Sequence, residues 1–143
     1  MIVACDGASR GNPGPAGVGA QITDPDGVVL AEVAEGIGVA TNNVAEYTAA
    51  IRGLERARDL GAREVLLRSD SRLLIEQLAG RFKVKNPTLQ QLHRAVRALA
   101  ATIDHVTYEH VPRERNTEAD RLANEGVDAW LAANDGSSDA NEP

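Results

Sequence analysis

The chain contains little of what stabilises secreted proteins or anchors membrane proteins. Cys5 is the only cysteine among 143 residues, so no internal disulfide can form. Small secreted domains commonly rely on disulfides, whereas cytosolic proteins rarely contain them. No apolar run reaches the length of a membrane helix, and the N-terminus lacks the basic-then-apolar layout of a signal peptide. We therefore predict a cytoplasmic protein with no membrane partner, and we interpret Cys5 as a small buried hydrophobe.

Aromatic residues are also scarce: the chain has one Trp, one Phe and two Tyr. Aliphatic side chains must therefore form the core, and the apolar fraction of 43% is typical of a globular protein. The length suits one domain and is too short for two ordinary ones. After Ala133 the chain is polar and has nothing to bury. We predict a monomer with one domain over residues 1–133 and a disordered acidic tail over residues 134–143.

The net charge of -6 argues against a generic nucleic-acid binder, which would normally be basic. The acids are unevenly distributed, however, because no Asp or Glu occurs between residues 77 and 103. That segment contains five basic residues, Arg81, Lys83, Lys85, Arg94 and Arg97. A local positive face can attract a phosphate backbone even on an acidic protein. The alternative is a chance gap in acids along a solvated helix.

Hydrophobic periodicity and turn residues predict an α/β domain. The expected strands are residues 2–8, 16–23, 28–37, 63–69 and 105–111. The expected helices are residues 44–60, capped by Asn42 or Asn43, and residues 72–78, 88–101 and 118–132. Three successive strands followed by alternating helices and strands imply a five-stranded mixed sheet, with three antiparallel and two parallel strands, flanked by helices. Right-handed crossovers would place the first and fourth strands side by side at its centre.

Four carboxylates have unusual positions in this pattern. Asp6 and Asp70 each follow a short apolar run of strand type, while Glu46 and Asp120 lie near the starts of two expected helices. Singly, each is more simply explained as a turn, cap or helix-dipole residue. Together, Asp6 and Asp70 would be neighbours at one sheet edge, and the helices would supply the other two. A carboxylate cluster needs cations, and two magnesium or manganese ions about 4 Å apart can clamp a phosphodiester.

Two polar segments accompany the carboxylates. The stretch from Gly11 to Gly19 matches neither the dinucleotide-binding fingerprint nor the Walker pattern, and we interpret it as a tight turn that brings the backbone and Asn12 close to a ligand. Thr41-Asn42-Asn43 precedes a helix N-terminus, which is a favourable place for a phosphate. Helix capping alone would also explain it, although three polar residues exceed what one cap requires.

These segments, taken in order, resemble type 1 ribonuclease H from about residue 2 to residue 130. The resemblance is carried by Asp6-Gly7-Ala8-Ser9 with Gly11-Asn12-Pro13-Gly14, by Thr41-Asn42-Asn43 with Glu46, by Ser69-Asp70-Ser71, and by the run from Asn116 to Asp120. It implies a ribonuclease H-like fold that binds RNA–DNA hybrids and cuts the RNA strand. It is nearest to the shorter bacterial and archaeal-like branch, which also occurs fused to a further domain, a phosphatase.

The resemblance also implies roles for individual residues. Asp6, Glu46, Asp70 and Asp120 would bind two Mg²⁺ ions, for which Mn²⁺ can substitute, and the products would carry 5′-phosphate and 3′-hydroxyl ends. Minor-groove contacts would come from Asn12, Asn42 and Asn43, and Thr41 would seat a DNA phosphate. The remaining substrate-binding residues would be Gly11, Ser71, Arg72, Asn116, Lys83 and Lys85.

Three departures from the family pattern shape these expectations. The loop at residues 111–116 lacks the His that many relatives carry, so we expect Arg115 to act near the scissile phosphate. Residues 79–89 are too few for the basic protrusion with which several relatives hold the DNA strand. That contact must be weaker here, or Lys83, Lys85 and the arginines nearby replace it. Arg72 stands where some relatives have Gln. Two alternatives stay open: a catalytically inactive hybrid-binding module, and a nuclease of the same fold acting on duplex RNA or DNA junctions.

Overall fold

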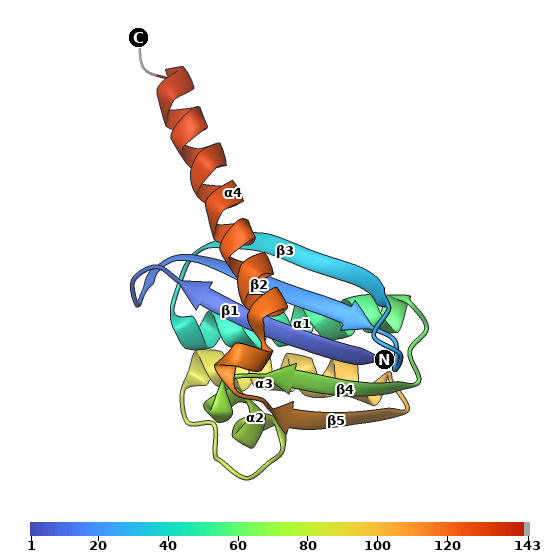
Figure 1. The fold of residues 1–143 in the computed structure, drawn as a ribbon. Helices are drawn as coiled ribbons and strands as arrows, with labels where there is room; N and C mark the ends of the chain where they lie inside the picture. The colour runs from blue at the N-terminus through green and yellow to red at the C-terminus, as the bar shows by residue number, and fades with distance from the viewer. Residues whose placement is uncertain (142–143) are drawn as a thin grey trace.

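The computed structural model describes residues 1–141, with side chains up to Asn134. Its single sheet has the order β3-β2-β1-β4-β5 (Figure 1). The strands are β1 (Ile2–Ser9), β2 (Gly14–Thr23), β3 (Val29–Ala40), β4 (Glu64–Ser69) and β5 (His105–His110). The first three run antiparallel, while β4 lies parallel to β1 and to β5. This confirms the predicted mixed sheet and the pairing of the first and fourth strands.

Helices cover both faces of the sheet (Figure 1). They are α1 (Asn42–Asp59), α2 (Arg72–Leu78), α3 (Pro87–Ala101) and α4 (Thr117–Asn141). The first three lie on one face, and α4 crosses the other over β1, β2 and β3. No helix within the described residues is long and apolar enough to cross a membrane. α4 runs to Asn141 and so passes the expected end of the closing helix at residue 132, while residues 142 and 143 lie outside the described ones. The expected disordered tail over residues 134–143 stays a prediction.

Two local expectations were wrong. Thr41, not Asn42 or Asn43, is the N-cap of α1, and its hydroxyl accepts a hydrogen bond from Val44 N at 3.2 Å. Glu46 consequently lies in the second helical turn. Asp6 is not at the end of its strand either, because β1 continues to Ser9 through its pairing with β2. Pairing with β4 stops at Ala4, so Asp6 lies beyond the part of β1 that β4 covers.

Glycines let α1 and α4 approach β1 and β2 closely. A Cβ built on Gly7 would lie 2.2 Å from the backbone carbon of Ala45 in α1. On the other face, a Cβ on Gly19 would lie 2.4 Å from the carbonyl oxygen of Ala119 in α4. Gly19 pairs with Asp6 across β1 and β2. Both helices therefore reach the sheet at the level of Asp6 because these two positions carry no side chain.

An aliphatic core holds this arrangement together. Val3, Ile22, Leu54 and Leu67 are fully buried between the sheet and the helices on its α1 side. Polar groups inside this layer are paired, as expected for buried side chains: Tyr47 donates from its hydroxyl to Oε1 of Gln77 at 2.6 Å. The core thus fixes α1 and α2 relative to each other and to the strands.

Candidate active site

Three carboxylates from separate elements converge beside the end of β4. Asp6 comes from β1, Glu46 from α1 and Asp70 from the residue after β4, and one carboxylate oxygen of each lies within 4.8 Å of the others. Asp6 and Glu46 are each only 5% exposed. Asp120 is not part of this tight group, but it lines the same cavity of about 480 Å³. The structure therefore brings all four predicted carboxylates to one pocket, which we call the catalytic pocket after their predicted role.

Hydrogen bonds hold two of the four carboxylates in place. The backbone N–H of Gly7 donates to Oε2 of Glu46 at 3.2 Å, which orients Glu46 toward β1. Asp120 lies in the first turn of α4, and the Asn124 side-chain amide donates to its backbone oxygen at 3.0 Å and to Oδ1 at 3.4 Å. The glycine contacts at β1 and β2 thus act on the site, since they determine how near Glu46 and Asp120 come to Asp6.

Burial and mutual repulsion make the cluster resist ionisation. Burial, together with the nearby carboxyls of Asp70 and Asp120, raises the pKa of Asp6 to about 8. Burial and the charges of Asp6 and Asp70 raise the pKa of Glu46 well above its ordinary value. Burial also raises the pKa of Asp70, although the charge of Arg113 opposes this rise. Such a set of oxygen donors fits divalent cations, because cations stabilise the ionised form of every member.

The side chain of Asn116 lies inside the protein, and its expected contact with substrate stays a prediction. It is 2% exposed, and its Nδ2 donates to the backbone oxygen of Cys5 at 3.0 Å. A hydrogen bond from Asn116 to Asp70 also lowers the pKa of that carboxyl. Asn116 therefore ties the start of α4 to β1 and steadies Asp70. Within the described residues, its Oδ1 is buried without a hydrogen-bond partner.

The loop before α4 carries two arginines, and the structure distinguishes them. Arg113 lines the catalytic pocket, and its charge lowers the pKa of Asp70. Arg115 is exposed and does not line the pocket. Arg113 is thus the cation of this loop nearest the carboxylates, and a role for Arg115 at the scissile phosphate stays a prediction. His110 also acts on Asp70 from the end of β5, since its charge lowers the pKa of that carboxyl.

The predicted groove residues form a second cavity beside the catalytic one. Asn12, Thr41 and Asn43 line a cavity of about 300 Å³. Asn86, in the loop between α2 and α3, also lines this cavity, and the sequence did not indicate that residue. Asn42 lines the catalytic pocket instead, and its backbone N–H donates to Oδ1 of Asn12 at 3.0 Å. Gly11 has a φ of 108°, a conformation that suits glycine. The tight-turn interpretation therefore fits the structure.

Two predicted binding residues follow β4. Ser71 lines the catalytic pocket and also caps α2, because its hydroxyl accepts a hydrogen bond from Leu74 N at 3.2 Å. Arg72 is exposed and lies outside the lining of the catalytic pocket, and its charge acts on Glu76 of the same helix. The structure therefore places Ser71 at the site and Arg72 outside it.

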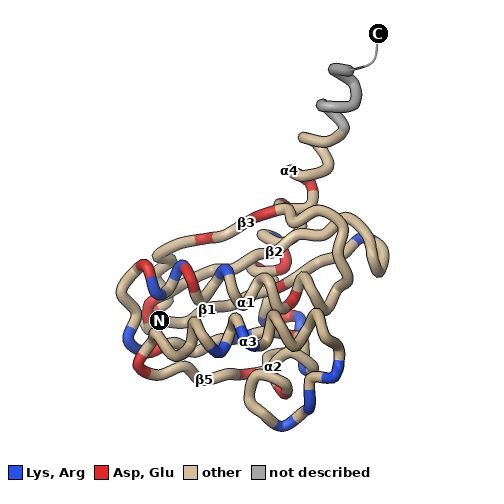
Figure 2. Tube along the Cα trace, turned by 180° about the vertical axis from the view of Figure 1, so that it is seen from behind, with Lys and Arg blue, Asp and Glu red and all other residues tan. Residues whose placement is uncertain are grey.

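The α2–α3 loop forms a basic region apart from the carboxylates. A cavity of about 590 Å³, which we call the α2–α3 cavity, is lined by Gln77, Gly80, Arg81, Phe82, Lys83, Val84, Gln90, His93 and Arg94. Figure 2 shows basic positions and no acidic ones along this loop. Glu76 pairs with Arg81 at 2.6 Å, but no ion pair within the described residues engages Lys83, Lys85 or Arg94. Lys83 thus lines this cavity, and Lys85 is exposed close by.

Comparison with known proteins places the chain among ribonucleases H. A family model described as "Reverse transcriptase-like" matches residues 4–126. The chain is 51% identical over 141 residues to Bifunctional protein Rv2228c of Mycobacterium tuberculosis, covering 98% of this chain and 38% of that protein. It is 47% identical to Ribonuclease HI of Halobacterium salinarum, covering 86% and 62%. It is 40% identical to Ribonuclease H of Halorhodospira halophila, covering 89% and 92%.

Solved structures agree with these relatives. The N-terminal RNase H domain of the Mycobacterium tuberculosis protein matches with a TM-score of 0.86 and 52% identity, covering 88% of this chain and 97% of that one. LC11-RNase H1 in complex with an RNA/DNA hybrid matches with a TM-score of 0.87 and 43% identity, covering 91% and 98%. The chain spans less than two thirds of the length of the first two relatives above. Sequence, fold and carboxylate geometry together show that the chain belongs to the type 1 ribonuclease H family.

Proposed function

We propose that this domain hydrolyses the RNA strand of RNA–DNA hybrids with the help of divalent metal ions. The observation that carries the proposal is the convergence of Asp6, Glu46 and Asp70 within 4.8 Å, with Asp120 in the same pocket. A family relative that is 43% identical has been solved with an RNA/DNA hybrid bound, which supports the substrate class. An inactive hybrid-binding module is disfavoured, because binding alone would not require four carboxylates beside one another.

The four carboxylates would hold two Mg²⁺ ions, and Mn²⁺ would substitute. Bound divalent ions supply Lewis acidity, lowering the pKa of water and neutralising charge on a reacting phosphate. Asp6 is central among the carboxylates, since it interacts with Glu46, Asp70 and Asp120. Asp6 would therefore be the main ligand, and Glu46, Asp70 and Asp120 would supply the remaining carboxylate oxygens. The products would carry 5′-phosphate and 3′-hydroxyl ends.

The protein contributes orientation around this centre. Gly7 and Asn124 hold Glu46 and Asp120 through the hydrogen bonds described above, so that little reorganisation is needed when the ions bind. Arg113 offers a permanent positive charge beside Asp70, where it would face a phosphate of the strand being cut. The exposed Asn12, Thr41 and Asn43 would meet the duplex next to it, where 2′-hydroxyls distinguish RNA from DNA.

A substrate panel tests this proposal. The domain is incubated with a hybrid, duplex RNA, duplex DNA and a DNA junction of matched length, with Mg²⁺ and with a chelator. We expect cleavage of the hybrid alone, in the RNA strand and only with the metal. Preferential cleavage of duplex RNA or of the junction would support a same-fold nuclease of other specificity. Hybrid binding without cleavage under every metal condition would support the binding module.

Other properties of the domain stay predictions. They are its cytoplasmic location, its monomeric state, and its fusion to a further domain in the native protein. Gel filtration with light scattering tests the monomer directly.

A further inference from the structure

Arg10 lies in the catalytic pocket, although no motif in the sequence singled it out. It follows β1 in the loop toward Gly11 and Asn12, and it lines the same cavity as Asp6 and Asp120. Its Nη1 lies 2.7 Å from Oδ1 of Asp128, and its side chain is 41% exposed. The guanidinium is therefore in the site and within reach of solvent and substrate.

The partners of Arg10 form a stripe along α4. Asp120, Asn124 and Asp128 are spaced four residues apart, so they lie on one face of the helix. Nη2 of Arg10 donates to Oδ1 of Asn124 at 3.3 Å, and Asn124 in turn donates to Asp120. Arg10 therefore stands at the outer end of a line of polar contacts that begins at a catalytic carboxylate.

The charges around the pocket explain why a cation at the position of Arg10 would favour substrate binding. A phosphate strand that approaches four carboxylates is repelled unless cations lie beside its path. Arg113 lines the pocket on the Asp70 side, and Arg10 lines it on the side of α4. An arginine also suits phosphate recognition, because its planar fork donates two parallel hydrogen bonds.

We propose that Arg10 binds a backbone phosphate of the RNA strand next to the scissile one, and that this phosphate replaces Asp128 as its partner. The present ion pair does not prevent the exchange, because both side chains reach water and exposed pairs contribute little. A doubly hydrogen-bonded phosphate is the stronger partner at this exposure. The inference rests on the proposed function, since it takes the RNA strand of a hybrid as the ligand.

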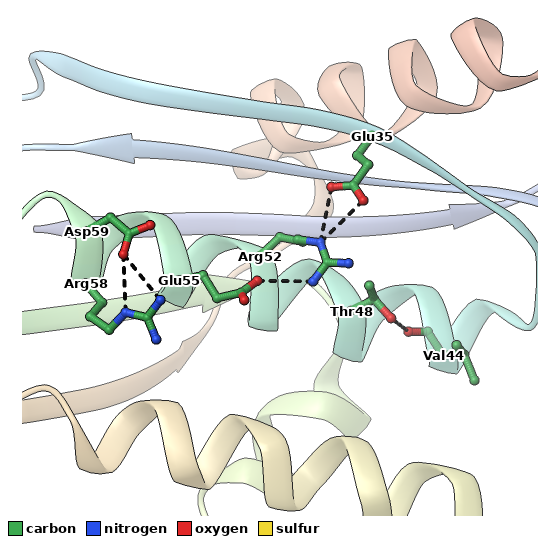
Figure 3. Close-up of polar contacts among 7 residues, drawn as sticks. All are labelled: Glu35, Val44, Thr48, Arg52, Glu55, Arg58 and Asp59. Carbon is green, nitrogen blue, oxygen red and sulfur yellow. Dashed lines mark hydrogen bonds and ion pairs between the residues drawn. The ribbon is translucent and has the colours of Figure 1, made fainter. Parts of the chain in front are cut away.

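Three substitutions distinguish a phosphate contact from a structural tie between the loop and α4. Arg10→Ala removes the cation, and Asp128→Asn removes only the charge of its ion-pair partner. Arg52→Ala is the matched control. Arg52 of α1 has a side chain that is 38% exposed, pairs with Glu35 of β3 and Glu55 of α1 (Figure 3), and lies outside the lining of the catalytic pocket. Hybrid affinity is measured against salt concentration in an Asp70→Asn background, so that substrate persists during the measurement.

Arg10→Ala should weaken hybrid binding roughly 3-fold to 10-fold and reduce the slope of log affinity against log salt by about 1. Asp128→Asn should leave the slope unchanged and strengthen binding, and Arg52→Ala should change neither quantity. Equal weakening by Arg10→Ala and Asp128→Asn with an unchanged slope would overturn the inference in favour of a structural tie. Wild-type cleavage is scored separately: its absence would remove the proposed function, while the Arg10→Ala and Arg52→Ala slopes would still decide the phosphate contact.

Discussion

Two cavities of similar size on this domain have opposite charge. The catalytic pocket of about 480 Å³ is lined by four carboxylates, two of them almost fully buried. The α2–α3 cavity of about 590 Å³ has no carboxylate in its lining and contains Arg81, Lys83 and Arg94. A nucleic acid is an anion at both places, so the two cavities cannot serve it in the same way. The acidic one requires cations before a phosphate can enter, whereas the basic one attracts phosphate directly.

The contrast also concerns how each region is held. Burial raises the pKa values of Asp6 and Glu46, so the folded protein keeps close together groups that repel one another when ionised. The basic side chains of the α2–α3 cavity are exposed and avoid that cost. Binding sites can be built from exposed charges on a loop. A metal site needs buried oxygens fixed by rigid elements, and here β1, α1 and α4 supply that rigidity.

The largest effect should follow from removing one charge of the acidic pocket. Asp70→Asn deprives the metals of a ligand while relieving repulsion, so turnover of hybrid should fall by roughly two orders of magnitude or more. The metal-free variant should melt at the wild-type temperature or higher, because a repelling group has gone. The control is Asp104→Asn, an exposed Asp between α3 and β5. Substantial Mg²⁺-dependent cleavage by Asp70→Asn would contradict the metal-ligand assignment.

The next effect tests whether the acidic pocket depends on the close approach of α1. Gly7→Ala places a Cβ 2.2 Å from the Ala45 backbone carbon, so α1 must move and carry Glu46 with it. We expect a loss of about 1–3 kcal/mol in the free energy of unfolding, as for other overpacked sites, and a turnover loss beyond that seen in an equally destabilised protein. Denaturant melts and single-turnover cleavage measure the two effects.

Gly27→Ala provides the control for Gly7→Ala. Gly27 has a φ of 87° and nothing within 4 Å of its Cβ position, so this change strains only a hairpin turn. Gly27→Ala should lower the free energy of unfolding by about 1 kcal/mol and leave turnover unchanged. Should Gly7→Ala behave like Gly27→Ala, the spacing of α1 from β1 would not govern the site.

The pH dependence of stability should differ with and without metal. The pKa of Asp6 is raised from 3.8 to about 8 on folding. Between these values the folded protein keeps a proton that the unfolded chain releases, so the contribution of Asp6 to stability is lost as pH rises toward 8. Mg²⁺ binds the ionised form and should therefore raise the melting temperature more at about pH 8.5 than at about pH 6.

Asp6→Asn isolates this effect, since Asn does not titrate. In chelator, the melting temperature of wild type minus that of Asp6→Asn should fall as pH rises. In Asp6→Asn, the rise in melting temperature caused by Mg²⁺ should differ less between about pH 8.5 and about pH 6 than it does in wild type. A difference that grows with pH in chelator would mean that Asp6 is ionised and stabilised in the metal-free protein.

The sequence predicted the helices and strands more completely than it predicted the contacts between them. Periodicity and turn residues were sufficient to locate the five strands and to place the first beside the fourth, and family motifs identified the four carboxylates that share the pocket. The exact cap of α1 was missed because Thr41, Asn42 and Asn43 are all good caps, and only backbone conformation selects Thr41. The burial of Asn116 was missed because an Asn before a helix is usually exposed, and its partner Cys5 lies 111 residues away.

The cations of the pocket were the least predictable part. Arg113 and Arg115 lie in the same short loop, and the turn Arg113–Arg115 determines which of them faces Asp70. Arg10 meets Asn124 and Asp128 only because α4 crosses the sheet at Gly17 and Gly19, where missing side chains permit it. Long flexible side chains leave no periodic pattern in a sequence, so their partners depend on the packing of distant elements.

The smallest effect concerns the basic cavity and tests whether it contacts the hybrid at all. Lys83, Lys85 and Arg94 are exposed, and each should neutralise at most one phosphate, so each Ala replacement should lower the salt slope of binding by roughly 1. Turnover at saturating hybrid should hardly change, because the carboxylates are untouched. The control is the triple Ala variant of Arg56, Arg58 and Arg63, three exposed arginines at or beyond the C-terminal end of α1 that give the same change in net charge. If this control and the triple Ala variant of Lys83, Lys85 and Arg94 show equal salt slopes, the basic residues at the α2–α3 cavity only keep α3 and its loop solvated. The grip on the duplex must then lie entirely beside the catalytic pocket.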